Sequence, residues 1–284
     1  MSALAEGRSR RRKGFDRPRF LWVMYVAMCL YLFVPILVVI VYSFNSSNSL
    51  QVFGGLSTRW YRAFWNDPQI KDSLVASFEV AAVTMVVATI LGTLLAFGLA
   101  RARGRIGGSA NILMLLPLIT PEIVTAVGLL LLFGRVGTPL SLKTIMLGHI
   151  TFSISYVTVI VRARLSLLNR EVEEAAMDLG ATELGALRLV TLPALYPAIA
   201  ASALLVFVLS FDDFVTSVFV SGAGTSPLPV RIYSLLRVGV SPEINAVGTT
   251  MIGITLLLAL ATLPLLLWRR RTEPPAAAAA PAAE

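Results

Sequence analysis

The stretch that decides the fold is EAAMDLGATELGALRLVTLP, residues 174–193. It is polar and rich in Ala and Glu, a composition that favours short helices in water, yet it lies between two long apolar runs. Gly180 interrupts it, as a glycine does where one helix ends and another begins, and Pro193 is expected to close it before the next apolar run. A pair of short polar helices that protrudes from the membrane spans is suited to contact a soluble partner. The plainer alternative is a surface helix that only ties two spans together.

The rest of the chain has the composition of an integral membrane protein. Of its 284 residues, 56% are hydrophobic and only 14% are charged, which excludes an ordinary soluble domain. Each of six apolar runs is long enough to cross a hydrocarbon core of about 30 Å as a helix. The runs cover residues 21–42, 80–100, 112–133, 144–161, 194–220 and 246–268, and the second helix is expected to begin near residue 73.

The distribution of basic residues gives the orientation. With the N-terminus inside, 17 of the 24 Lys and Arg residues fall in cytoplasmic segments, in keeping with the positive-inside rule. Both termini and the loop at 162–193 are then cytoplasmic. The predicted organisation is a basic cytoplasmic tail (1–20), a six-helix membrane domain (21–271) and a low-complexity, disordered tail (272–284).

Several function classes are excluded by what the sequence contains. The net charge of +8 comes from residues that flank the apolar runs, so attraction to anionic membrane lipid explains it better than nucleic acid does. A single cysteine, Cys29, and a single histidine, His149, offer no metal site and no catalytic group, and His149 is expected to be a hydrogen-bonded packing residue. No phosphate-binding loop motif is present, so the chain itself is not expected to hydrolyse ATP.

The loop has a spacing that resembles the signature of permease subunits of bacterial ABC importers. The pattern is Glu-Ala-Ala (174–176), three residues, Gly180, nine residues, Val190, one residue and Leu-Pro (192–193), with Val where Ile is usual. The resemblance implies the type I importer permease fold, in which this loop forms cytoplasmic coupling helices that dock on an ATPase subunit, which binds ATP and Mg. The residues assigned to that coupling are Glu173, Glu174, Ala175, Ala176, Gly180, Ala181, Leu192 and Pro193.

The resemblance extends over residues 20–265. Segments 118–130, 148–165, 209–215 and 228–246 look like the second permease subunit of spermidine/putrescine importers. That family implies a bacterial inner-membrane complex of two different permease subunits, two ATPase copies and a soluble extracytoplasmic binding protein. The substrate would be a polyamine, taken up by alternating access. A permease for an amino acid, a sugar or an iron complex is the alternative within the class.

Glu122 is the first candidate for the substrate pathway. Acidic residues inside membrane spans are costly and therefore mark function or specific pairing. Glu122 lies about 15 Å into the run 112–133, at 1.5 Å per residue, just after Pro117 and Pro121, which remove helix hydrogen bonds and bend the chain. It either lines a pore or pairs with a neighbouring helix.

Asp212 and Asp213 are the second candidate group. Adjacent residues point about 100° apart on a helix, so one is expected to line the path while the other braces the span. Asp213 is the first choice for the path, because it shares a helical stripe with Ser210 and Ser217.

The fourth apolar run supplies a third polar surface. Thr151, Ser155 and Thr158 share one helical face, with Tyr156 nearby, and either contact substrate or serve ordinary helix packing. Carboxylates and hydroxyls spaced along a path suit an extended polycation, and aromatic faces assist. An ion-coupled secondary transporter would also explain buried acids. That class usually shows more spans and internal repeats, and it has no use for an ATPase-docking loop.

Overall fold

The computed structural model describes residues 19–101, 105–224, 226–239 and 241–261, and the regular elements in these ranges are helices. The predictions for both tails, and for the end of the sixth run beyond residue 261, lie outside the described residues. The elements are α1 (Arg19–Ser43), α2 (Arg59–Asn66), α3 (Pro68–Arg101), α4 (Arg105–Ile119), α5 (Glu122–Val136), α6 (Leu142–Leu165), α7 (Arg170–Asp178), α8 (Glu183–Ala186), a π-helical turn (Leu187–Thr191), α9 (Leu192–Asp212), α10 (Val215–Val220), α11 (Leu228–Val238) and α12 (Pro242–Ala261).

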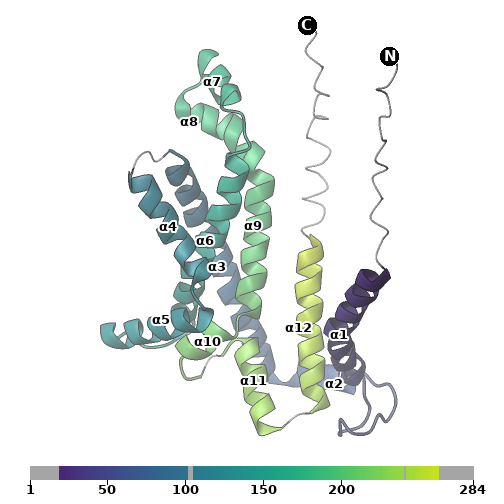
Figure 1. Ribbon diagram of the computed structural model, residues 1–284. Coiled ribbons are helices and arrows are strands. Elements are labelled where there is room, and N and C mark those ends of the chain that lie inside the picture. The colour runs from purple at the N-terminus through teal and green to yellow at the C-terminus, as the bar shows by residue number, and fades with distance from the viewer. Residues whose placement is uncertain (1–18, 102–104, 225, 240, 262–284) are drawn as a thin grey trace, which may run out of the picture.

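Long helices α3, α6 and α9 form the centre of the bundle (Figure 1). Buried small and branched residues fill their contact, among them Ala88, Val157 and Leu195. The helices α3 and α6 approach closely at Gly92, whose carbonyl accepts a hydrogen bond of 3.1 Å from Thr158. A side chain at Gly92 would overlap Val157, so the absence of a Cβ there sets the distance between the two helices.

Five helices are long and apolar enough to cross a membrane in the described residues, and a bent pair gives up to six. The five are α1, α3, α6, the continuous run Glu183–Asp212, and α12. α1 packs beside α12. The first residues of α1 and the last residues of α12 lie toward the end of the molecule where α7 and α8 are found (Figure 1). This arrangement agrees with the number of runs predicted from the sequence.

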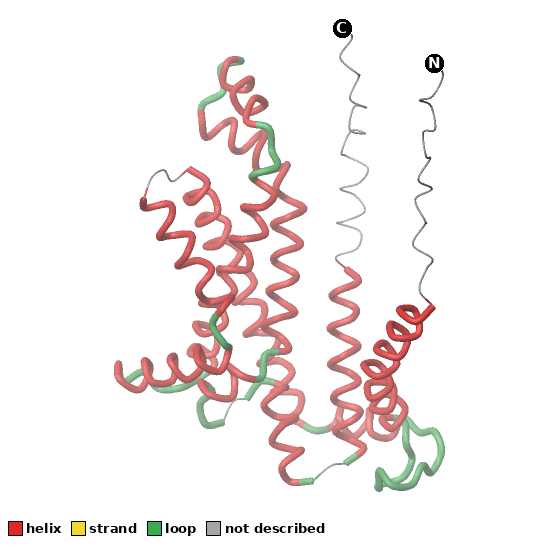
Figure 2. The backbone as a smooth tube through the Cα atoms, in the orientation of Figure 1, coloured by secondary structure: helices red, strands yellow, loops and turns green. Residues whose placement is uncertain are grey.

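The third run is not one straight helix. It divides into α4 and α5, which meet at an angle of 104° (Figure 2). Pro121 lies in the break and cannot donate a backbone hydrogen bond to α4, while the Thr120 amide still donates to the Leu116 carbonyl at 2.9 Å. The prolines were expected to bend this segment, and the bend places Glu122 at the first residue of α5 rather than inside a helix.

The fifth run also differs from the continuous helix predicted for residues 194–220. α9 ends at Asp212, Asp213 is extended with ψ of 119°, and α10 begins at Val215. The segment between the first and second runs contains the short helix α2, and the segment between the fifth and sixth runs contains α11. The second span begins at Pro68 rather than near residue 73.

The signature loop folds into two helical pieces at one end of the molecule (Figure 1). Gly180 separates α7 from α8 with φ of +95°, as predicted. The expectation that Pro193 closes the loop is wrong, because the helix continues from Glu183 through Pro193 to Asp212. A π-helical turn at Leu187–Thr191 precedes the proline, and its wider hydrogen-bond spacing accommodates a residue that has no amide proton.

Candidate functional site

The two broken helices bring three carboxylates to one cavity of about 440 Å³. Glu122 begins α5, Asp212 ends α9 and Asp213 lies in the gap before α10. The cavity is lined by Pro117, Leu118, Thr120, Glu122, Thr125, Phe152, Tyr156, Val208, Leu209, Asp212, Asp213, Phe214, Val215 and Thr216. All three acids singled out in the sequence therefore meet in one place, although their helices are far apart in the chain.

Asp213 contacts two backbone amides and the His149 ring. It is only 7% exposed, and its Oδ1 accepts backbone hydrogen bonds from Thr216 at 2.9 Å and Ser217 at 3.4 Å. Its Oδ2 lies 3.2 Å from His149 Nε2 on α6. One carboxylate thus caps α10 and also meets the histidine, which fixes the break between α9 and α10.

His149 is a hydrogen-bonded packing residue, as predicted from its isolation in the sequence. The ring is fully buried, its Nδ1 lies 2.7 Å from Ser210 Oγ and its Nε2 lies 3.2 Å from Ser217 Oγ. The serines stand on opposite sides of the α9–α10 break. The predicted stripe of Ser210, Asp213 and Ser217 therefore converges on one imidazole, and Asp213 also lines the cavity.

Asp212 occupies the more open position. Its side chain is exposed, and both carboxylate oxygens accept from Thr255 Oγ1 on α12 at 3.0 Å. Both acids line the cavity, with Asp212 exposed and Asp213 buried in the extended gap after α9, so the division into one pathway acid and one bracing acid stays a prediction. The first choice made from the sequence was Asp213.

Glu122 completes the acidic lining. Its side chain is exposed at the start of α5, and it interacts electrostatically with Asp213 and His149. Aromatic rings of Phe152, Tyr156 and Phe214 face the same cavity. Carboxylates beside aromatic faces attract organic cations. In the described residues no group of three or more His, Cys, Asp or Glu side chains has the geometry to hold a metal ion.

The cavity-facing side of α6 is one residue away from the face expected. Phe152 and Tyr156, spaced by four residues, line the cavity. Thr151 and Ser155 lie outside that lining, and Thr151 donates to the Leu147 carbonyl at 2.7 Å. Tyr156 was among the predicted residues, whereas Phe152 was missed because the prediction followed hydroxyl groups; its spacing of four residues from Tyr156 was the available signal.

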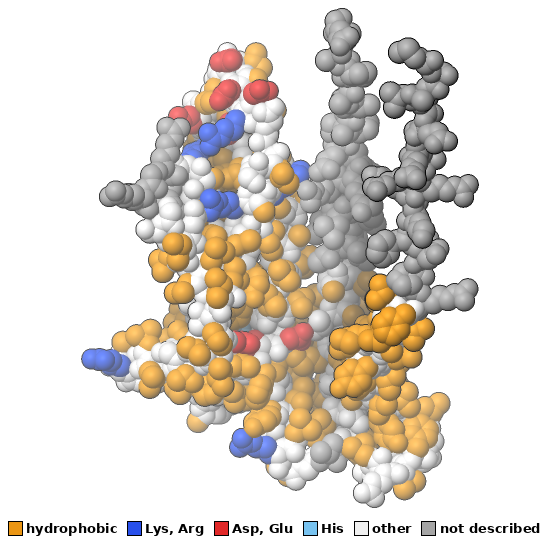
Figure 3. All heavy atoms as spheres, in the orientation of Figure 1, with side chains coloured by type: hydrophobic (Ala, Val, Ile, Leu, Met, Phe, Trp, Pro, Cys, Tyr) orange, Lys and Arg blue, Asp and Glu red, His pale blue; other side chains and the backbone are white. Residues whose placement is uncertain are grey.

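A second candidate site is the tip formed by α7 and α8. No side chain of α7 is buried, and α7 carries the predicted coupling residues Glu173, Glu174, Ala175 and Ala176. Large apolar side chains are also exposed here, with Leu179 at 90%, Leu184 at 60% and Leu189 at 76%. Figure 3 shows acidic side chains at this tip, basic side chains just beneath it and hydrophobic ones over much of the remaining visible face.

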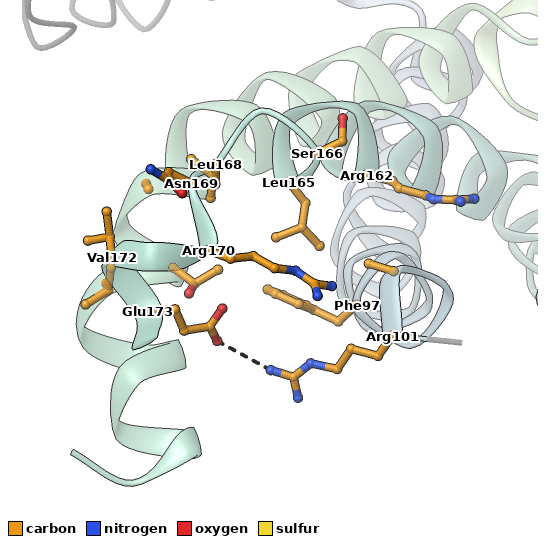
Figure 4. Close-up of a pocket in the computed structure, with 14 residues that line it drawn as sticks. Phe97, Arg101, Arg162, Leu165, Ser166, Leu168, Asn169, Arg170, Val172 and Glu173 are labelled. Atoms are coloured by element: carbon orange, nitrogen blue, oxygen red, sulfur yellow. Dashed lines mark hydrogen bonds and ion pairs between the residues drawn. The ribbon is translucent and has the colours of Figure 1, made fainter. Parts of the chain in front are cut away.

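The base of the tip is tied to the membrane bundle. Arg101, the last residue of α3, forms an ion pair with Glu173 of α7 at 3.5 Å (Figure 4). Ala181 follows Gly180 in the turn, whereas Leu192 and Pro193 begin α9. The predicted coupling residues are thus divided between an exposed tip and the start of a span. A movement of the tip would reach α9 through continuous helix.

Curated relatives share much of this sequence. The chain is 43% identical over 231 residues to the putrescine transport system permease protein PotI of Escherichia coli K12, covering 78% of this chain and 82% of the relative. It is 39% identical over 259 residues to the spermidine/putrescine transport system permease protein PotC of Haemophilus influenzae, covering 91% and 98%.

The fold is also found in a solved transporter. A chain from the crystal structure of a bacterial ABC transporter involved in the import of the acidic polysaccharide alginate matches with a TM-score of 0.69. The match covers 91% of this chain and 97% of that chain, at 14% sequence identity. The family described as the inner membrane component of binding-protein-dependent transport systems matches residues 88–274, more than half of the chain. The protein therefore belongs to this family of binding-protein-dependent membrane permeases.

Proposed function

We propose that the chain is a permease subunit of a polyamine importer and that its carboxylate cavity forms part of the cation path. The observation that carries the proposal is the meeting of Glu122, Asp212 and Asp213 at two helix breaks. Helices broken within a membrane place free backbone groups and polar side chains at substrate sites in other transporters.

The chemistry of the cavity favours an organic cation over the alternative solutes. Carboxylates attract ammonium groups, and the rings of Phe152 and Phe214 offer faces for a charged amine. Among the described residues no Lys or Arg lines the cavity, so a carboxylate-bearing amino acid or an acidic sugar would meet charges of its own sign. The names of the two curated relatives, a putrescine and a spermidine/putrescine permease, support the same substrate class.

The assembly follows from the permease role. This chain leaves ATP hydrolysis to a partner ATPase, and we propose two ATPase copies, a second and different permease subunit, and a soluble binding protein. The exposed leucines around Gly180 suit a cleft on an ATPase subunit. Both termini and the α7–α8 tip then lie on the cytoplasmic side. ATP-driven closure moves the tip, and the two access states exchange because ligand and nucleotide bind them differently.

Asp212→Asn tests the cation path. Removing the charge while keeping the shape weakens contact with an ammonium group by the value of a charged hydrogen bond, about 1.5–3 kcal/mol. The expected result is a loss of about tenfold or more in kcat/KM for radiolabelled spermidine or putrescine uptake, at unchanged assembly with the ATPase. Asp72→Asn is the matched control, because Asp72 is an exposed acid of α3 outside the cavity lining.

Uptake by the complete transporter should be competed by unlabelled polyamines and not by amino acids or sugars. Equal uptake by Asp212→Asn and Asp72→Asn would remove Asp212 from the path. ATP turnover stimulated only by a binding protein loaded with another solute, without polyamine uptake, would keep the permease and reject the polyamine.

A further inference from the structure

A pocket of about 520 Å³ lies at the junction of the membrane bundle and the α7–α8 tip. It is separate from the carboxylate cavity, since the two share no lining residue. The ends of α3 and α6 and the starts of α7 and α9 enclose it (Figure 4). Its lining consists of Phe97, Ala100, Arg101, Arg162, Leu165, Ser166, Leu168, Asn169, Arg170, Val172, Glu173, Val190, Thr191 and Ala194.

The lining has a surplus of positive charge. Three arginines face a single acid, Glu173. That acid is used by Arg101, and Arg162 at the rim donates to the neutral side chain of Asn111. Two guanidinium charges are thus left without a carboxylate in the pocket. Arg101 and Arg170 are exposed, and an anion between such neighbouring positive charges would offset their repulsion.

Arg170 is the side chain that points to a ligand. It extends into the pocket beside Phe97 and toward Arg101 (Figure 4). Among the described residues it has no hydrogen-bond or ion-pair partner, although it is the first residue of α7 and comes directly after the cap Asn169. A planar guanidinium with all its donors free matches the oxygens of a phosphate group.

The opposite part of the lining is apolar. Phe97, Leu165 and Val190 face the pocket with the arginines. Phe97 and Leu165 lie near the ends of α3 and α6, two helices long and apolar enough to cross a membrane, and Val190 lies in the π-helical turn before α9. A free inorganic anion gains no favourable contact from these apolar side chains. A headgroup phosphate attached to glycerol and acyl chains uses both halves of the lining.

We propose that this pocket binds the phosphate of an anionic lipid headgroup. The phosphate bridges Arg170 and Arg101, and it joins the start of α7 to the end of α3 in addition to the Arg101–Glu173 pair. The lipid then steadies the base of the tip that contacts the ATPase. Binding itself does not depend on which solute is transported, so it is tested independently of the polyamine assignment.

The experiment compares lipid retention by the complete transporter carrying Arg170→Gln or Arg164→Gln. Arg164 is the matched control, because it lies at the same end of α6 but outside the pocket lining. Native mass spectrometry of the complex titrated with phosphatidylglycerol measures the affinity of bound lipid. ATPase stimulation is then measured for the same complexes in two kinds of nanodisc: phosphatidylethanolamine mixed with phosphatidylglycerol, and phosphatidylethanolamine mixed with phosphatidylcholine. A third measurement adds inorganic phosphate to the discs that contain phosphatidylcholine.

Loss of a charge-assisted contact should weaken phosphatidylglycerol retention by about tenfold in Arg170→Gln, while Arg164→Gln should weaken it less, because Arg164 lies outside the pocket lining. Stimulation by phosphatidylglycerol should fall in parallel. If inorganic phosphate reproduces the stimulation, or if both variants retain lipid equally, the lipid proposal is overturned. In the first of these cases the pocket is a site for soluble phosphate, and in the second it holds no specific anion.

Discussion

Gly180→Val perturbs the turn between α7 and α8 without disturbing its packing. Gly180 has φ of +95°, and its amide donates to the Met177 carbonyl at 2.9 Å, while the Ala181 amide donates to the Ala176 carbonyl at 3.1 Å. These two bonds form a Schellman motif, whose left-handed residue is usually glycine. A Cβ at this position would meet no atom within 4 Å, so the effect of valine comes from the backbone alone.

The magnitude follows from that geometry. A left-handed conformation costs about 1–2 kcal/mol for a residue with a Cβ, and a β-branched residue is at the upper end. A difference of this size lowers the equilibrium constant for forming the native turn by a factor of about 5 to 30, which is the largest fall in its population that the change can cause. Because the turn is exposed and no side chain of the adjoining α7 is buried, the fold of the bundle should survive. Only the orientation of α7 against α8 changes.

The assay is solute uptake and binding-protein-stimulated ATP turnover in membranes containing the complete transporter, with the abundance of each subunit measured. Coupled uptake should fall by up to a similar factor of about 5 to 30 in Gly180→Val. Gly180→Asn is the control, since asparagine tolerates the left-handed region and should retain most activity. Normal transport by Gly180→Val at normal abundance would refute the docking role of this turn, and equal losses in both variants would refute the conformational reasoning.

Two further variants test the packing that positions the cavity. Gly92→Ala would force a Cβ against Val157 at 2.6 Å and should destabilise the purified chain by about 1–3 kcal/mol. Gly98→Ala on the same helix is the control, because its Cβ meets nothing within 4 Å. Thermal unfolding in detergent compares the two variants, and equal midpoints would contradict the close approach of the helices. His149→Leu leaves the buried Asp213 carboxylate without its partner and should destabilise the protein by about 3–5 kcal/mol, with partial recovery in His149→Gln. A midpoint of His149→Leu equal to that of the unchanged protein would show that the contact with Asp213 carries no stability.

The signature loop, residues 162–193, was the part of the molecule most readily predicted from the sequence. A glycine between two Ala- and Glu-rich segments has few conformational alternatives, and Gly180 takes the expected turn. Pro193 misled the prediction, because a proline within the first turn of a helix is also compatible with continuation. The π-helical turn before it has no local sequence signature in LRLVT, so the continuous helix could not be anticipated.

The break at Asp213 shows why the site was only partly predictable. LSFDDFV contains no proline or glycine, and a continuous helix was the natural interpretation. The break is held by His149, which reaches Ser210, Asp213 and Ser217 from a helix more than sixty residues away in the chain. A local signal did exist, because an aspartate three residues before Thr216 has the spacing of a helix cap.

The helix breaks also decide which acid is available to a cation. Asp213 caps the start of α10 and Glu122 lies in the first turn of α5, so each offsets the positive end of a helix. Asp212 is the last residue of α9, where the free carbonyl groups carry partial negative charge, and its only hydrogen-bond partner among the described residues is the neutral hydroxyl of Thr255. Its charge is therefore the least compensated of the three. A cation in the cavity gains most by approaching Asp212, and this electrostatic difference arises only because the helix ends there.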